Sequence, residues 1–129
     1  MAGLKNLIGV KAAEKLIFLT ILILMLVPIF ENPVFMTGDG PAHLYNSHIL
    51  KELISGNAEL YDPYFELNHL PEPNWMGHVL LTVLLFVFEP FTAEKILVGF
   101  YVVMFMFGFR YLVAAFKDKN LWTSYFAFA

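Results

Sequence analysis

Long apolar stretches alternate with polar segments along the chain. Three of these stretches, at about residues 16–30, 76–91 and 96–116, predict membrane-spanning helices. A bilayer core about 30 Å thick requires roughly 20 apolar residues in helical form, and neighbouring apolar residues extend the first stretch toward that length. The pattern therefore predicts an all-α, polytopic membrane fold.

Another apolar run, residues 121–129, ends the sequence and is too short to cross a bilayer. We interpret it as the start of a truncated fourth helix, or as a sign that the natural protein is longer. Internal repeats and low-complexity tracts are absent from the sequence, so we expect a single membrane domain over residues 1–129.

The polar segment at residues 31–75 contains the pattern of one amphipathic helix. Pro41 suits its first turn, Gly56 suits its end, and no helix breaker lies between Ala42 and Ser55. At about 100° per residue, an apolar stripe follows one side of this helix, which predicts that it lies along the membrane surface or on the spans. The side expected to be covered holds His43, Asn46, Ile49, Leu50, Leu53 and Ile54, and the wet side holds His48, Lys51 and Glu52.

The distribution of charge predicts an orientation. Three lysines, Lys5, Lys11 and Lys15, precede the first apolar stretch, whereas residues 31–75 contain seven acids and one base. By the positive-inside rule the N-terminus is expected in the cytoplasm and the loop outside an inner or plasma membrane, with the second span returning inward and the third running outward. Lys117 and Lys119 then lie outside, against the rule, but the first helix usually dominates orientation.

Composition supports a membrane protein. Hydrophobic residues make up 59% of the chain and aromatic residues 17%, more than one soluble domain of 129 residues could hide from water. Cysteine is absent, which excludes disulfides. The bilayer is therefore the expected partner, and no nucleic-acid partner is expected.

The run Thr37-Gly38-Asp39-Gly40-Pro41-Ala42-His43 is the main candidate for chemistry. Asp39 lies just after the first span and ahead of the predicted helix, where unpaired backbone N–H groups favour negative charge. His43 follows one turn later. The structural alternatives are that Asp39 caps the helix or shapes a turn, and that His43 is a packing residue.

Two further charged residues are candidates for substrate contact. Glu72 lies between two prolines of the loop, where solvation is the simpler explanation. Arg110 lies within the third apolar stretch, where a cation is costly, so it is expected to pair, to snorkel or to line a cavity. Contact with a phosphate is the functional alternative for Arg110.

The layout of these pieces resembles the GT-C class of integral-membrane glycosyltransferases, which includes protein O-mannosyltransferases and lipid A aminoarabinose transferases. In that class the first span is followed by an external loop with an acid, a surface helix ending in glycine, and a proline-rich stretch leading to an aromatic residue. Many members have Asp-Glu where this chain has Asp39-Gly40, and an arginine where it has Lys95. The matching pieces are Asp39, the helix from Pro41 to Ser55, Gly56, the run Pro71-Glu72-Pro73-Asn74-Trp75 and the turn from Phe88 to Ile96.

The resemblance implies transfer of a sugar from a polyprenyl-phosphate donor to an acceptor at the outer membrane face. Asp39 would be the catalytic base, and His43, Asn46, Glu72 and Arg110 would contact substrate. A divalent cation between carboxylate and phosphate stays open as a cofactor, but Asp39 and His43 alone are too few ligands to assign one.

Two other functions stay open. A small accessory or structural subunit would dock its loop on a larger membrane assembly and use Asp39 only as a cap. A transporter fragment would place charged residues at mid-membrane depth, for which only Glu89 and Arg110 are near candidates.

Overall fold

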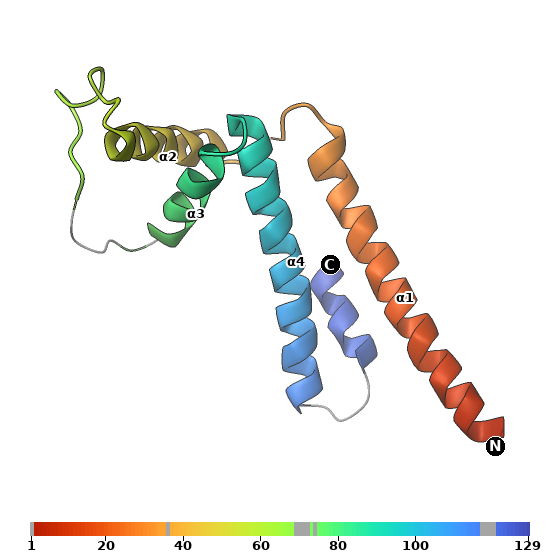
Figure 1. Cartoon of the computed structure of the whole chain (residues 1–129). Helices are drawn as coiled ribbons and strands as arrows, with labels where there is room; N and C mark the ends of the chain where they lie inside the picture. Colours follow the sequence, from red (N-terminus) through yellow and green to blue (C-terminus); the bar gives the residue numbers. More distant parts are fainter. Residues whose placement is uncertain (1, 36, 69–72, 74, 117–120) are drawn as a thin grey trace. The chain divides into compact units, whose positions relative to one another are not determined.

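The computed structural model describes residues 2–35, 37–68, 73, 75–116 and 121–129, with side chains from Val10 onward. All regular structure in these ranges is helical, as predicted. The elements are α1 (Ala2–Glu31), α2 (Gly40–Ser55), α3 (Trp75–Leu85), α4 (Pro90–Phe116) and the 3₁₀ helix η1 (Leu121–Phe128) (Figure 1). The chain forms two compact units, residues 1–31 with 99–129, here called the hairpin unit, and residues 32–98, here called the insert.

Two of the described helices are long and apolar enough to cross a membrane. They are Val10–Glu31 of α1, with 22 residues, and α4, with 27 residues. At 1.5 Å per residue they are about 33 and 40 Å long, against a bilayer core of about 30 Å. Only 22% and 17% of their most apolar windows are buried. This low burial favours lipid contact over the core of a soluble protein.

Within the hairpin unit, α1 and the second part of α4 run in opposite directions. The ring of Phe18 meets the ring of Phe107 edge to face, with 5.7 Å between centroids. At the other end, the Phe30 ring lies 3.1 Å from where a Cβ on Gly99 would be, so a larger residue there would require the ring to shift by a few tenths of an ångström. The core of the unit consists of Phe18, Leu22 and Met106, packed against Met25, Val102, Val103, Tyr125, Ala127 and Phe128.

An ion pair joins the two helices of the hairpin unit. The Arg110 guanidinium donates to both carboxylate oxygens of Glu14, each at 2.7 Å. The two side chains are only 13% and 8% exposed, and the guanidinium also lies over the Phe18 ring. Two parallel hydrogen bonds between a guanidinium and a carboxylate restrict geometry as well as adding energy. The pair therefore defines the register of α1 against α4.

The predicted helix at 76–91 is shorter than expected. Helix α3 ends at Leu85, backbone hydrogen bonds within residues 83–88 form a turn, and Pro90 begins α4. Proline suits the first turn of a helix because it has no backbone N–H to satisfy. Residues 90–95, predicted as the turn before the third span, are therefore the start of α4. An 11-residue helix is about 16 Å long, well below the thickness of a bilayer core.

This short α3 changes the expected path of the chain. Three successive spans would make the first and third helices run in the same direction, whereas α1 and the second part of α4 are antiparallel. The segment predicted as the start of a fourth helix forms η1, which packs beside α1 and α4 within the hairpin unit (Figure 1). Lys117 and Lys119 lie outside the described residues.

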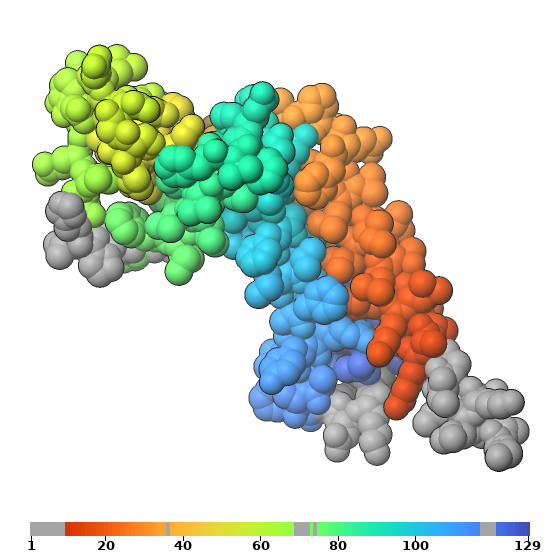
Figure 2. Space-filling view, viewed as in Figure 1, coloured from red at the N-terminus to blue at the C-terminus, as the bar shows by residue number. Residues whose placement is uncertain are grey.

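The insert is built on the contact between α2 and α3, whose surfaces meet directly in Figure 2. The Thr82 hydroxyl donates to the Ser47 backbone carbonyl at 3.2 Å, so the two helices approach closely. One turn away, His43 contacts His78. Successive turns of α2 therefore meet successive turns of α3 in the same chain direction. The core of the insert consists of Leu81, Leu85, Ala93 and Leu97, with Leu44, Leu80 and Leu84 packed against it.

Helix α2 matches its predicted bounds, but not all of its predicted covered face. Gly56 ends the helix in the left-handed region, at φ 70°, as expected. Helix α3 packs on a small residue of α2, Ser47, which is fully buried, and the aliphatic stripe is only partly covered. The prediction was wrong for His43, Asn46 and Ile54, which are exposed, and for Lys51 and Glu52, which are half-buried; Ile49 is buried and Leu50 and Leu53 are half-buried.

We expect the hairpin unit to depend on the Glu14–Arg110 pair. Replacing Glu14 with glutamine leaves a buried cation without its counter-charge, which should lower the free energy of unfolding by on the order of 3 kcal/mol. The double variant Glu14→Leu with Arg110→Met removes both desolvation costs, so its free energy of unfolding should fall much less. Unfolding followed by circular dichroism in detergent micelles measures these free energies. The exposed Lys15→Gln variant is the control, and equal losses in the single and double variants would contradict the assignment.

Candidate functional site

Asp39 is the residue that precedes the first turn of α2, as the sequence predicted. It is exposed, and its carboxylate makes no hydrogen bond to the helix N-terminus. An aspartate at this position usually accepts a hydrogen bond from a backbone N–H two or three residues later. The Asp39 backbone carbonyl accepts the first hydrogen bond of the helix, from the His43 N–H at 3.0 Å, as the carbonyl of a residue at this position ordinarily does. The capping role weighed for Asp39 is therefore not seen in its side chain.

A second carboxylate, Glu94, lies at the same end of α2. It is 5% exposed, and the Thr37 hydroxyl donates to its Oε1 at 3.5 Å. Glu94 also lies against Gly40, where any added Cβ would collide with the carboxylate. The positive end of the helix dipole stabilises negative charge at such a place. Gly40 is thus needed so that Glu94 can approach the start of α2.

Sequence reasoning missed Glu94 because it treated residues 88–96 as a turn. The signal was present, since an acid four residues after Pro90 falls within the first turns of a helix that proline begins. The neighbouring Lys95 donates to the backbone carbonyl of Asn32. Glu94 and Lys95, both at the start of α4, thus contact residues that lie before α2 or at its first position.

His43 forms a pair with His78 of α3. The His43 Nδ1 and His78 Nε2 atoms are 2.8 Å apart, and the ring centroids are 4.9 Å apart. One ring must donate and the other accept, so at least one imidazole is neutral while this bond exists. Burial, followed by the nearby His43, lowers the pKa of His78 below its usual value of 6.5.

An open groove of about 450 Å³ runs beside these residues within the insert. Its walls are mainly hydrocarbon, and Glu94 is the carboxylate that lines it. It is lined by Pro41, Leu44, Tyr45 and His48 of α2 and by Pro90, Phe91 and Glu94 of α4. The groove therefore combines an apolar surface with a buried acid at one helix start.

The other predicted substrate contacts fall in different places. Asn46 is exposed on α2, and Glu72 lies outside the described residues. Arg110 belongs to the hairpin unit, where both of its terminal nitrogens donate to Glu14. The structure thus brings Asp39, His43 and Asn46 into one unit, and Arg110 into the other. Two of the outcomes weighed for Arg110 are observed, since it pairs with Glu14 and also lines a small open pocket of about 150 Å³ beside Phe18 and Phe107.

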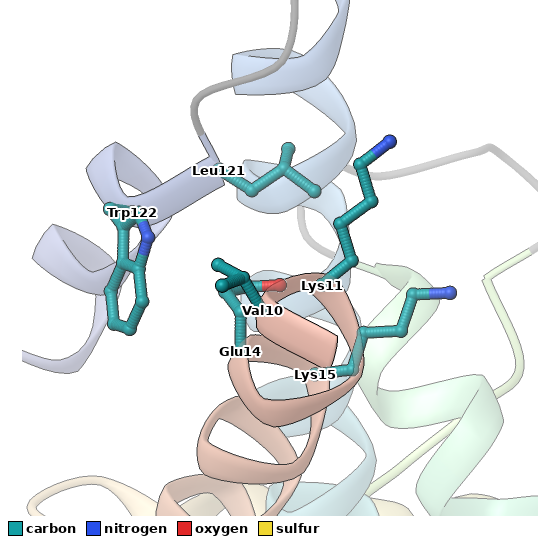
Figure 3. Close-up of a pocket in the computed structure, with 6 residues that line it drawn as sticks. All are labelled: Val10, Lys11, Glu14, Lys15, Leu121 and Trp122. Atoms are coloured by element: carbon teal, nitrogen blue, oxygen red, sulfur yellow. The ribbon is translucent and has the colours of Figure 1, made fainter. Parts of the chain in front are cut away.

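A second polar cluster surrounds that ion pair. The Tyr125 hydroxyl donates to the Glu14 backbone carbonyl at 2.8 Å, and Arg110 donates to the Ser124 hydroxyl at 3.3 Å. A pocket of about 330 Å³ opens next to it, between α1 and η1. Figure 3 shows the Lys11 and Lys15 side chains extending to one side and Trp122 on the other.

Sequence reasoning missed Glu14 because three nearby lysines were counted only for orientation. Its carboxylate is occupied by Arg110, so this cluster is explained by the packing of the hairpin unit. Among the described residues there is no group of three or more histidine, aspartate or glutamate side chains that could hold a metal ion.

We expect the contact between α2 and α3 to weaken in acid. Because the pKa of His78 is lower in the folded protein, its contribution to stability is present above the unfolded value near 6.5 and is lost as pH falls through the folded value. The thermal unfolding midpoint should therefore drop between about pH 7.5 and pH 5. His78→Leu should flatten this dependence, while His48→Gln should keep it. If the unfolding midpoint of His78→Leu falls with pH as steeply as that of the unmodified protein, the histidine pair is not the cause of the acid sensitivity.

Comparisons with known proteins return no match: no protein-family model, curated protein or solved structure is similar to this chain. The likeness to the GT-C class remains a prediction from the layout of the sequence.

Proposed function

We propose that this chain is part of a GT-C type membrane glycosyltransferase, which transfers a sugar from a polyprenyl-phosphate donor to an acceptor hydroxyl. The observation that carries the proposal is the Asp39 carboxylate, which is exposed at a helix start yet makes no capping hydrogen bond. A carboxylate that the helix does not use is available to take a proton from substrate.

The proposed arrangement in the membrane follows from the hairpin unit. Glu14 and Arg110 lie at one end of it, and Phe30 and Gly99 at the other. If the two helices cross a bilayer, Phe116, the last residue of α4, lies at the same end as Lys11 and Lys15, and the positive-inside rule assigns that end to the cytoplasm. The N-terminus is cytoplasmic in this arrangement, and the insert faces outward from an inner or plasma membrane.

The proposed reaction needs one base and one leaving group. The Asp39 carboxylate accepts the proton of the acceptor hydroxyl, and the resulting oxygen forms a bond to the anomeric carbon of the sugar. The bond from that carbon to the phosphate oxygen breaks, and polyprenyl phosphate leaves with the electron pair. Because no protein nucleophile takes part, the configuration of the sugar inverts.

A second candidate is an accessory subunit of a larger membrane assembly. It is favoured by apolar side chains of the insert that the chain itself leaves uncovered. Leu60 and Tyr64, in the segment after α2, are 74% and 80% exposed. A docking role would use this surface and would leave the Asp39 carboxylate without a function.

The orientation is testable by cysteine labelling, because the chain has no cysteine of its own. Asn57→Cys, in the exposed turn after α2, should react with an impermeant thiol reagent in intact cells. Lys11→Cys, at the opposite end of α1, should react only after lysis. Labelling that is reversed between the two variants would overturn the orientation.

The catalytic role is testable by Asp39→Asn, which keeps the size of the side chain and its capacity to cap but removes its charge. Membranes containing the protein at its natural length are supplied with polyprenyl-phosphate-linked sugars labelled in the sugar. Transfer should fall by roughly a hundredfold or more, the range for removal of a general base.

The matched control is Asp62→Asn, an exposed acid of the same insert, which should keep full transfer activity. Circular dichroism should show unchanged helical content in both variants. Full transfer by Asp39→Asn would remove Asp39 as the base. Absence of transfer by the unmodified protein with every donor would favour the accessory role.

A further inference from the structure

We propose that the groove beside α2 and the start of α4 binds a long-chain lipid alcohol, with its hydroxyl donating to Glu94. The binding rests on the groove alone and is independent of the proposed function. Its volume of about 450 Å³ lies within the roughly 300–1,000 Å³ range of small-molecule sites.

The walls of the groove favour a hydrocarbon chain. Leu44, Tyr45 and Phe91 line it, and the latter two side chains are 54% and 50% exposed. Exposed aromatic rings beside other apolar side chains gain the most free energy when a further apolar surface covers them. An extended alkyl or isoprenoid chain matches this lining, whereas a free sugar would place several hydroxyl groups against hydrocarbon.

The Glu94 carboxylate favours a head group that donates a hydrogen bond. A carboxylate can accept about four hydrogen bonds. Among the described residues, the structure gives Glu94 one, from the Thr37 hydroxyl at the long distance of 3.5 Å. Of the nearby N–H groups of α2, those of Gly40 and His43 donate to backbone carbonyls, and Pro41 has none.

Charge selects the kind of head group. A phosphate or fatty-acid carboxylate would be repelled by Glu94, so the groove does not suit the polyprenyl-phosphate donor. An ammonium group would be attracted by the carboxylate, but it would lose hydration against the hydrocarbon walls and would lie beside the positive end of α2 at Gly40. A neutral hydroxyl donates to the carboxylate without either penalty.

Photolabelling of the purified full chain in nanodiscs tests the proposal. The two probes are a long-chain alcohol carrying a diazirine and the fatty acid of the same length, used at about pH 7.5, where the fatty acid is ionised. The alcohol should label peptides containing Leu44 to His48 or Phe91 several-fold more than the fatty acid does. Equal labelling by both probes, or labelling spread evenly along α1 and α4, would overturn the proposal.

Glu94→Gln removes the charge and keeps the shape, so labelling by the fatty acid should rise to the level of the alcohol. Glu89→Gln, an exposed acid just before α4, is the matched control and should keep the preference. Leu44→Trp fills the groove while leaving Glu94 intact, and it should abolish labelling by both probes. It also provides a test should Glu94→Gln lose helical content. An unchanged preference in Glu94→Gln, or full labelling of Leu44→Trp, would reject the site.

The result is independent of sugar transfer. Asp39→Asn should label as the unmodified protein does, because Asp39 does not line the groove. Loss of transfer with intact labelling supports both proposals. Intact labelling in a protein without any transfer activity would reject the enzymatic function and keep the lipid-alcohol site.

Discussion

The bidentate contact between Glu14 and Arg110 is the interaction on which the arrangement of the long helices depends. Each charge alone would be costly among the apolar side chains of α1 and α4. Because the two are fully paired and nearly buried, they join one particular turn of α1 to one particular turn of α4. Sliding either helix by a turn would separate the charges and expose both to hydrocarbon.

This register has a consequence for the rest of the chain. It makes the two helices antiparallel, so residues 31 and 99 lie at the same end of the hairpin unit. The intervening segment leaves and returns at that end. The short α3 fits this path, because an 11-residue helix does not need to cross a bilayer to be accommodated. An ion pair near one end of the hairpin unit thus constrains where the insert begins and ends.

In the insert, two small residues of α2 allow close contacts with other helices. Gly40 lets the Glu94 carboxylate reach the start of α2, and Ser47 lets α3 approach closely enough for Thr82 to bond its carbonyl. The result is two acids in contrasting environments at one helix start. Asp39 is exposed and Glu94 is buried.

The sequence by itself determined helix α2, the two long apolar helices and the position of Asp39, because these depend on neighbouring residues. Pro41 and Gly56 bound α2, and two long apolar runs produce α1 and α4. The partners of the polar residues were decided by the tertiary structure alone. Arg110 pairs with Glu14, which is 96 residues away in the sequence, and Thr37 donates to Glu94, which is 57 residues away. The helical wheel also misplaced Ile54, which is exposed, since it weighs apolar area and cannot anticipate that α3 packs on a small residue of α2. Periodicity reports which residues can share a face, but which face is covered depends on the shape of the helix that meets it.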